Sequence, residues 1–175
     1  MPPPRVEICT SGLTWIGLRS SIAEDVEHLT FAGKEIQGLV DELAGDEEPV
    51  RRAFDWVVNN IESDDAILAV GANETMRTGR GSRTVLLYTL LREMGIEVDY
   101  LMVNTAAAEA PVSSWPDPNA YSAELLRARE QGRWIWLDPA ASTPKAGQIS
   151  EELQGRPGLL LDPESPFLGL IVPAR

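Results

Sequence analysis

The stretch that decides the fold runs from Gly79 to Val103 and reads Gly-Arg-Gly-Ser-Arg-Thr-Val-Leu-Leu-Tyr-Thr-Leu-Leu-Arg-Glu-Met-Gly-Ile-Glu-Val-Asp-Tyr-Leu-Met-Val. It predicts a glycine-rich loop, a buried helix over about 83–94 and, after Gly95, a strand with one buried face. Apolar residues cover most of the helix circumference, which is typical of a helix packed on several sides. Ser82 or Thr84 can cap the helix start. We therefore expect this helix to be the centre of the domain and the loop before it to be the place for any chemistry.

The sequence before this stretch is mainly helical in pattern. Apolar residues recur every three or four positions in three segments, which predicts amphipathic helices that each need a partner. A proline after three acidic residues marks the start of the third of these helices. The predicted elements are a strand at 5–9, helices at 15–29, 36–43 and 49–60, and a crossing loop at 62–78 with one helical turn around 66–70.

The sequence after it changes to a strand pattern. Residues 104–119 are small and broken by prolines, which indicates an exposed loop. Helix propensity is high in Tyr121–Glu130, but Gln131-Gly132 is a tight-turn signal before the strand-like 133–137, so we favour a hairpin. Residues 139–175, rich in proline and glycine, are expected to form an extended tail that wraps the domain and packs on it through 147–161. These elements predict an α+β domain with helices packed on one side of an antiparallel sheet.

Composition limits both the number of domains and the class of partner. A chain of 175 residues that is 43% hydrophobic can bury one sizeable core, so we expect a single domain over 1–175. The formal net charge of −12 repels phosphate backbones and anionic lipid, which disfavours nucleic acid and membrane surfaces as partners. No apolar run is long enough to span a bilayer, and the first residues do not form a signal peptide. The chain is expected to be soluble.

The single cysteine and the single histidine restrict the chemistry further. One thiol excludes an internal disulfide and a cysteine metal cluster, and one imidazole leaves too few ligands for a zinc site. Cys9 lies in an apparent strand and is interpreted as a small buried hydrophobe. His28 follows several acidic residues and is interpreted as a solvated surface side chain. We expect neither a metal nor a cofactor.

Three motifs make the chain resemble the bacterial transglutaminase-like superfamily, whose fold is papain-like. The motifs lie at 54–61 (Phe-Asp-Trp-Val-Val-Asn-Asn-Ile), at 86–96 with its Leu-Leu-Arg-Glu-Met-Gly-Ile, and at 134–139 (Trp-Ile-Trp-Leu-Asp-Pro). The segments 11–19 and 147–156 look similar to a subgroup in which this domain follows a β-sandwich domain in large exported bacterial proteins. The resemblance implies a domain excised from a longer protein of the periplasm or the cell exterior.

The family's chemistry is a Cys-His-Asp triad, and the resemblance assigns its positions here. Counting without gaps from the matching motifs places the cysteine on Arg80, the histidine on Ala123 and the aspartate on Asp138. Arginine cannot attack a carbonyl and alanine cannot accept a proton, so we expect a catalytically inactive member with a structural or binding role. The alternative is a shift of two residues that makes Ser82 the nucleophile of a hydrolase or acyltransferase, with Glu124 or Asp138 as a poor base.

The arginines of the loop suggest a second kind of function. Arg80 and Arg83, with Ser82 at the helix start, could bind a carboxylate, a phosphate or a peptide ligand, although pairing with the chain's own carboxylates is favoured. Trp115, in the loop at 104–119, is the best candidate for contact with a protein partner or with other domains. If the triad has been lost, we expect Arg80 to reach into the old cleft and to clamp Asp138 or, failing that, Glu124.

Overall fold

The computed structural model describes residues 14–64, 68–105, 117–162, 165 and 169–174. Its elements, in chain order, are five α-helices, two short 3-10 helices and seven strands. The expected strand at 5–9, Cys9 and Trp115 lie outside the described residues. The helices are α1 (Trp15–Leu29), α2 (Lys34–Leu43), α3 (Pro49–Asn60), α4 (Ala72–Thr78), α5 (Arg83–Glu93), η1 (Pro118–Ala120) and η2 (Glu151–Leu153). The strands are β1 (Glu62–Ser63), β2 (Arg80–Gly81), β3 (Val98–Asn104), β4 (Tyr121–Glu130), β5 (Arg133–Leu137), β6 (Pro157–Leu160) and β7 (Gly169–Ile171).

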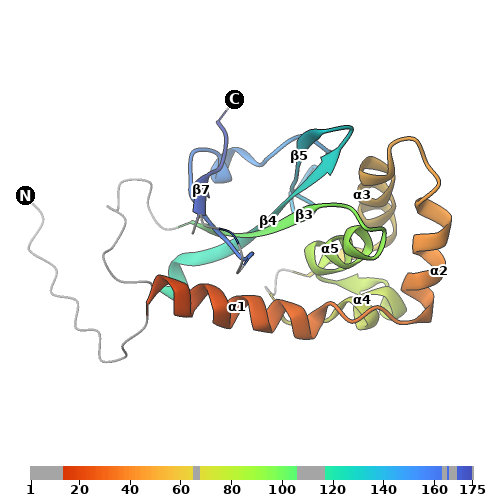
Figure 1. Ribbon diagram of the computed structural model, residues 1–175, viewed down its shortest axis with the longest axis horizontal. Helices are drawn as coiled ribbons and strands as arrows, with labels where there is room; N and C mark the ends of the chain where they lie inside the picture. Colours follow the sequence, from red (N-terminus) through yellow and green to blue (C-terminus); the bar gives the residue numbers. More distant parts are fainter. Residues whose placement is uncertain (1–13, 65–67, 106–116, 163–164, 166–168, 175) are drawn as a thin grey trace, which may run out of the picture.

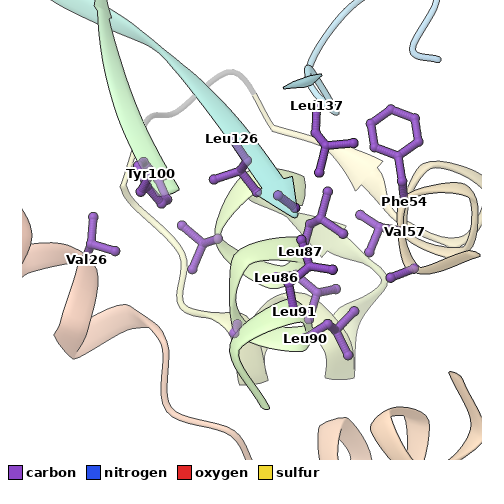
Figure 2. Close-up of a cluster of buried hydrophobic side chains, with 14 of the residues drawn as sticks. Val26, Phe54, Val57, Leu86, Leu87, Leu90, Leu91, Tyr100, Leu126 and Leu137 are labelled. Carbon is purple, nitrogen blue, oxygen red and sulfur yellow. The ribbon is translucent and has the colours of Figure 1, made fainter. Parts of the chain in front are cut away.

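Helix α5 occupies the centre that the sequence predicts for it. Figure 1 shows it against the main sheet, beside α3 and α4. Ser82 caps its start, and Gly95, at φ +71°, follows its end. Leu86, Leu87 and Leu90 are fully buried. Figure 2 shows these leucines among side chains from α3, the sheet and α1, so the helix is enclosed on several sides.

The main sheet is antiparallel, with strand order β5-β4-β3-β6-β7. Residues from α1 to α5 share one core with one face of this sheet, which confirms the predicted α+β arrangement. The opposite face packs a second apolar cluster, to which Leu153 and Val172 of the C-terminal part contribute. The C-terminal part of the chain therefore covers the face that the helices leave open.

Two segments differ from the expectations. The region expected to be a crossing loop contains β1 and α4, because the apolar face of α4 is too short to give a periodic signal; the expected turn around 66–70 lies partly outside the described residues. The expected extended tail supplies β6 and β7 to the sheet, and its Leu159 to Leu161 are buried. Leu159 and Leu160 pack into different clusters, so β6 has two buried faces and shows no alternation.

Candidate functional site

The start of α5 is built by Gly81 and Ser82. Gly81 has φ +145°, and a Cβ at this position would lie 2.4 Å from Oγ1 of Thr75, so only glycine fits. Ser82 follows in an extended conformation, and its Oγ accepts a hydrogen bond of 3.1 Å from the backbone N–H of Val85. The side chain is 4% exposed. The serine is thus a buried N-cap of α5, at the position that the two-residue shift assigns to the nucleophile.

Strand β4 brings Glu124 to this helix start. Leu126 and Ala128, at two-residue spacing from Glu124, pack in the core that contains α5, so Glu124 faces the helix. Burial raises the pKa of the Glu124 carboxyl, because desolvation penalises its charged form. The hydroxyls of Tyr100, Thr84 and Ser82 and the backbone of Leu68 oppose this increase.

This carboxyl is nevertheless incompletely paired. Within the described part of the chain, Oε1 of Glu124 and the hydroxyl of Tyr100 lack a hydrogen-bond partner of acceptable geometry. The two groups nevertheless interact, because the Tyr100 hydroxyl lowers the pKa of Glu124. The pKa of Tyr100 is well above its usual value because of burial, with a further contribution from the negative charge of Glu124. Ser82, Thr84, Tyr100 and Glu124 therefore form a buried polar cluster in an otherwise apolar core.

Ala123, the residue counted as the histidine position, does not face α5. Ala123 and Leu125 pack in the second cluster, on the face of the sheet opposite to the helix. The ungapped count is therefore one residue away from the side chain that faces Ser82, and a shift of one residue in a strand moves a side chain to the other face. The alternation of Leu126 and Ala128 was the signal that could have chosen Glu124 over Ala123 as the residue of β4 that faces α5. The arrangement brings Glu124 to Ser82, as the shifted alternative required.

The predicted clamp between Arg80 and Asp138 or Glu124 is wrong. The Arg80 side chain is 61% exposed, with Nε 3.8 Å from Oδ2 of Asp64 and one terminal nitrogen 4.0 Å from Oε1 of Glu62. The pairing of β1 with β2 places Arg80 opposite Glu62 and so turns it away from the sheet. Asp138 is 2% exposed, and its Oδ2 accepts hydrogen bonds from the N–H of Ser150 at 2.9 Å and from its Oγ at 2.5 Å.

A clamp does exist at this place, but Arg83 forms it. Its guanidinium donates to the carbonyl oxygens of Ile61 (2.7 Å), Val58 (3.1 Å) and Pro139 (3.3 Å). These bonds connect the end of α3, the start of α5 and the residue after Asp138. Burial lowers the pKa of Arg83, because the charged guanidinium is partly desolvated. With Arg80 paired to carboxylates, both arginines are engaged within the chain, which favours internal pairing over an anion site.

A cavity of about 510 Å³ lies beside this region. Glu124, Ala123 and Asp138 line it, together with residues of β1 and of the segments after β5. Its lining side chains are mostly carboxylates and hydroxyls: Ser63, Asp64, Thr105, Ser122, Glu124, Asp138, Ser142, Ser150 and Glu152. Among the described lining residues there is no lysine, arginine or histidine. We call this space the acidic cavity.

A larger cavity, of about 700 Å³, lies elsewhere and involves α1, α5 and β3. Its acidic residues are partly neutralised, because Arg92 pairs with Glu27 at 2.6 Å and Arg127 pairs with Asp99. The guanidinium of Arg92 also lies over the ring of Tyr88. Of the polar cluster at the α5 start, Tyr100 lines this cavity, whereas Ser82, Thr84 and Glu124 do not.

Metal binding and membrane insertion find no support in the described residues. No group of three or more histidine, cysteine, aspartate or glutamate side chains is placed there to hold a metal ion. His28 is exposed at the end of α1. None of the described helices is long and apolar enough to cross a bilayer.

Comparison with known proteins gives structural matches only. No family model matches the sequence, and no curated protein matches it. A putative protease from Parabacteroides distasonis ATCC 8503 superposes with a TM-score of 0.68 at 15% identity, over 91% of this chain and 31% of its own. A putative cysteine protease from Cytophaga hutchinsonii gives a TM-score of 0.44 at 18% identity, over 66% of this chain and 42% of its own. The first likeness supports the papain-like fold that the sequence predicts, and this chain spans under a third of that structure's length.

Proposed function

We propose that this chain is a catalytically inactive papain-like domain that acts as a structural or protein-binding module. The observation that carries the proposal is that Ser82 is a buried helix cap. It stands at the start of the central helix, but it is buried and its oxygen accepts the N–H of Val85. A nucleophile needs an accessible lone pair and a base within reach. Ser82 has the geometry of a helix cap instead.

The groups around Ser82 also argue against a triad. The side chain that faces it from β4 is the carboxyl of Glu124, and the only imidazole of the sequence belongs to His28, exposed on α1. The only thiol belongs to Cys9, which precedes α1 in the sequence. Asp138 accepts hydrogen bonds from Ser150, so this carboxylate has a structural partner. We infer that the nucleophile and base positions hold residues unable to perform these roles, and that the matching aspartate, Asp138, serves the fold instead.

The proposed setting is a larger bacterial protein in the periplasm or outside the cell. The similar Parabacteroides structure, a putative protease, is about three times as long as the part this chain covers, since that part is 31% of its length. Other domains would then be natural partners for the surfaces of this one.

Turnover assays test the proposed inactivity. The purified chain is incubated with a fluorogenic peptide library, and separately with a glutamine donor and a fluorescent amine. We expect neither hydrolysis nor amine incorporation above the blank, and no difference between the unmodified chain and Ser82→Ala. The proposal is refuted if turnover is detected, is lost in Ser82→Ala and is kept in the control Ser20→Ala on α1. That result would establish the serine hydrolase or acyltransferase alternative.

A further inference from the structure

The main sheet has an open edge at β7. Among the described residues, β7 has a neighbouring strand on one side only, which is β6. The N–H of Val172 donates to Arg156 and its carbonyl accepts from Gly155, both at 2.9 Å, so this residue directs its backbone toward the β6 side. Successive residues of a strand direct their N–H and C=O groups to opposite edges, so Ile171 and Gly169 direct theirs outward. These outward groups can bind one further strand.

An exposed apolar side chain marks the same edge. Ile171 is 65% exposed, whereas its neighbours Leu170 and Val172 pack in the second apolar cluster on the other face. Natural proteins usually cover or blunt an apolar strand edge, because it is a template for strand addition. A strand added at β7 would form backbone hydrogen bonds and bury Ile171 at the same time.

The sequence contains a suitable strand in residues 5–9. Val6 and Ile8 alternate with Glu7, which predicts a strand with one apolar side. These residues lie outside the described part of the chain, which begins at Thr14, immediately before α1. The five residue steps from Cys9 to Thr14 can span about 17 Å when extended. The occupant of the edge can thus come from the same chain.

The position of α1 brings this segment to the β7 side of the sheet. The ring centroids of Trp15 and Tyr121 are 6.0 Å apart, at the end of the sheet where the strand register also places Ile171. Arg19 donates to the carbonyl oxygen of Ser165, in the connection between β6 and β7, at 3.1 Å. Figure 1 shows the start of α1 and β7 at the same end of the molecule. The chain therefore enters α1 close to the open edge.

A second copy of the chain is the less suitable occupant. Each copy carries a net charge of −12, so two copies repel each other. The edge offers only the three residues of β7, which is too little area for a stable interface between separate molecules. A segment of the same chain needs no such area, because its effective concentration at the edge is already high.

We propose that the outer edge of β7 binds residues 5–9 of the same chain as an additional strand of the main sheet. Ile171 exchanges backbone hydrogen bonds with this strand, and Val6 or Ile8 covers its side chain. The added strand closes the sheet edge and ties the start of α1 to the C-terminal part of the chain. The proposal goes beyond the inactive-domain hypothesis, since it holds whether or not the domain is catalytically active.

Amide hydrogen exchange measured by NMR tests the proposal. The full chain is compared with a chain that lacks residues 1–10. We expect the Ile171 amide to be protected in the full chain and to exchange about tenfold faster in the truncated one. Leu170, whose N–H faces β6, is the internal control and should exchange at the same rate in both. Equal exchange of the Ile171 amide in the two chains would overturn the proposal.

Substitutions in the full chain make the test independent of truncation. Ile8→Asp places a charge in the proposed strand and should speed exchange at Ile171 by about tenfold. Ile16→Asp, the matched control, alters a side chain on α1 that is 60% exposed, and should leave this exchange unchanged. The assignment is refuted if exchange at Ile171 responds to neither variant, or equally to both.

A nitroxide on Cys9, the single thiol of the sequence, identifies the source of the strand. It should broaden the amide signals of Leu170 and Ile171 more than those of β5, at the opposite edge of the sheet. A mixture of unlabelled nitroxide-carrying chain and unmodified ¹⁵N-labelled chain detects contact between copies, and should show no broadening. Broadening at β7 in this mixture would assign the edge to a second copy and contradict the proposal. None of these measurements involves turnover, so a negative result leaves the inactive domain standing.

Discussion

At the scale of single residues, Arg83 and Arg80 show how differently two arginines three positions apart can act. Arg83 is partly buried and donates to three carbonyl oxygens, while Arg80 makes long, exposed ion pairs. A charged donor to buried carbonyls contributes far more to stability than an exposed pair that water and salt screen. The contribution of each arginine thus follows from its depth in the fold.

Replacing these arginines one at a time measures that difference. Arg83→Ala should lower the free energy of unfolding by about 2–3 kcal/mol, because the carbonyls of Val58, Ile61 and Pro139 lose their donor. Arg80→Ala, the matched control, should cost well under about 1 kcal/mol. Urea unfolding curves provide both values, and equal losses would show that the clamp does not stabilise the fold.

The buried carboxyl of Glu124 makes stability depend on pH. Its pKa in the folded chain is raised by burial, so the folded state holds the proton more tightly than the unfolded one. The contribution of this group to stability is therefore greatest at low pH and declines as pH rises from the unfolded glutamate pKa of about 4.3 through the raised folded value.

The variant Glu124→Gln isolates this effect because glutamine does not titrate. Its stability relative to the unmodified chain should increase as pH rises through that window and level off above the folded pKa of Glu124. Unfolding free energies of both proteins, measured at a series of pH values, check the trend. A difference that stays constant or decreases with rising pH would show that the folded carboxyl is not destabilised by burial.

At the scale of elements, the turn into α5 depends on a glycine. Gly81 combines φ +145° with close contact to Thr75 of α4, so it determines how α4 and α5 meet. Gly38 lies within α2, has a helical backbone and has nothing within 4 Å of its would-be Cβ. The two glycines therefore differ in their backbone φ angle and in the space available for a Cβ.

Alanine at these two positions should have opposite effects. Gly81→Ala forces a side chain into a disfavoured backbone region and against Thr75, and should cost about 2–3 kcal/mol. Gly38→Ala should stabilise the chain by roughly 0.5–1 kcal/mol, because alanine is the better helix former. Thermal and urea unfolding measure both, and a neutral Gly81→Ala would mean that the helix start adapts freely.

At the scale of the whole molecule, the sheet depends on the C-terminal part of the chain. Strand β6 pairs with β3 along the centre of the sheet, and Leu153, Leu160 and Val172 fill the second cluster. The hydrogen bonds that Asp138 accepts also come from this part, through Ser150. The C-terminal segment, which the sequence predicts to be an extended tail, is therefore an integral part of the domain.

Truncation tests this dependence. Removing residues 147–175 takes away β6, β7 and the apolar cover of one sheet face, so the melting temperature should fall by more than about 10 °C or the cooperative transition should disappear. Removing only residues 173–175, beyond the buried Val172, should leave the midpoint unchanged. Equal midpoints for the long truncation and the full chain would show that the segment is only a linker.

The sequence by itself determined the elements whose pattern is local. The helix at 83–94, its glycine stop and the hairpin at 121–137 follow from the apolar pattern and turn chemistry, and the structure confirms them and selects Ser82 of the two candidate caps. Helix α4 and strand β6 were not predicted from the sequence, because α4 is short and β6 is buried on both faces. A short helix gives too few repeats for a period, and a strand buried on both faces shows no alternation of apolar and polar residues.

Only the tertiary structure decided which side chains meet at the start of α5. Counting along the chain assigned Ala123 to the cleft and Arg80 to a clamp, but strand alternation turns Ala123 away, and the short β1 and β2 pairing holds Arg80 beside Glu62. Glu124 and Arg83 take those places instead. Such positions depend on register and on contacts between residues far apart in sequence, where a shift of one residue reverses the direction of a side chain.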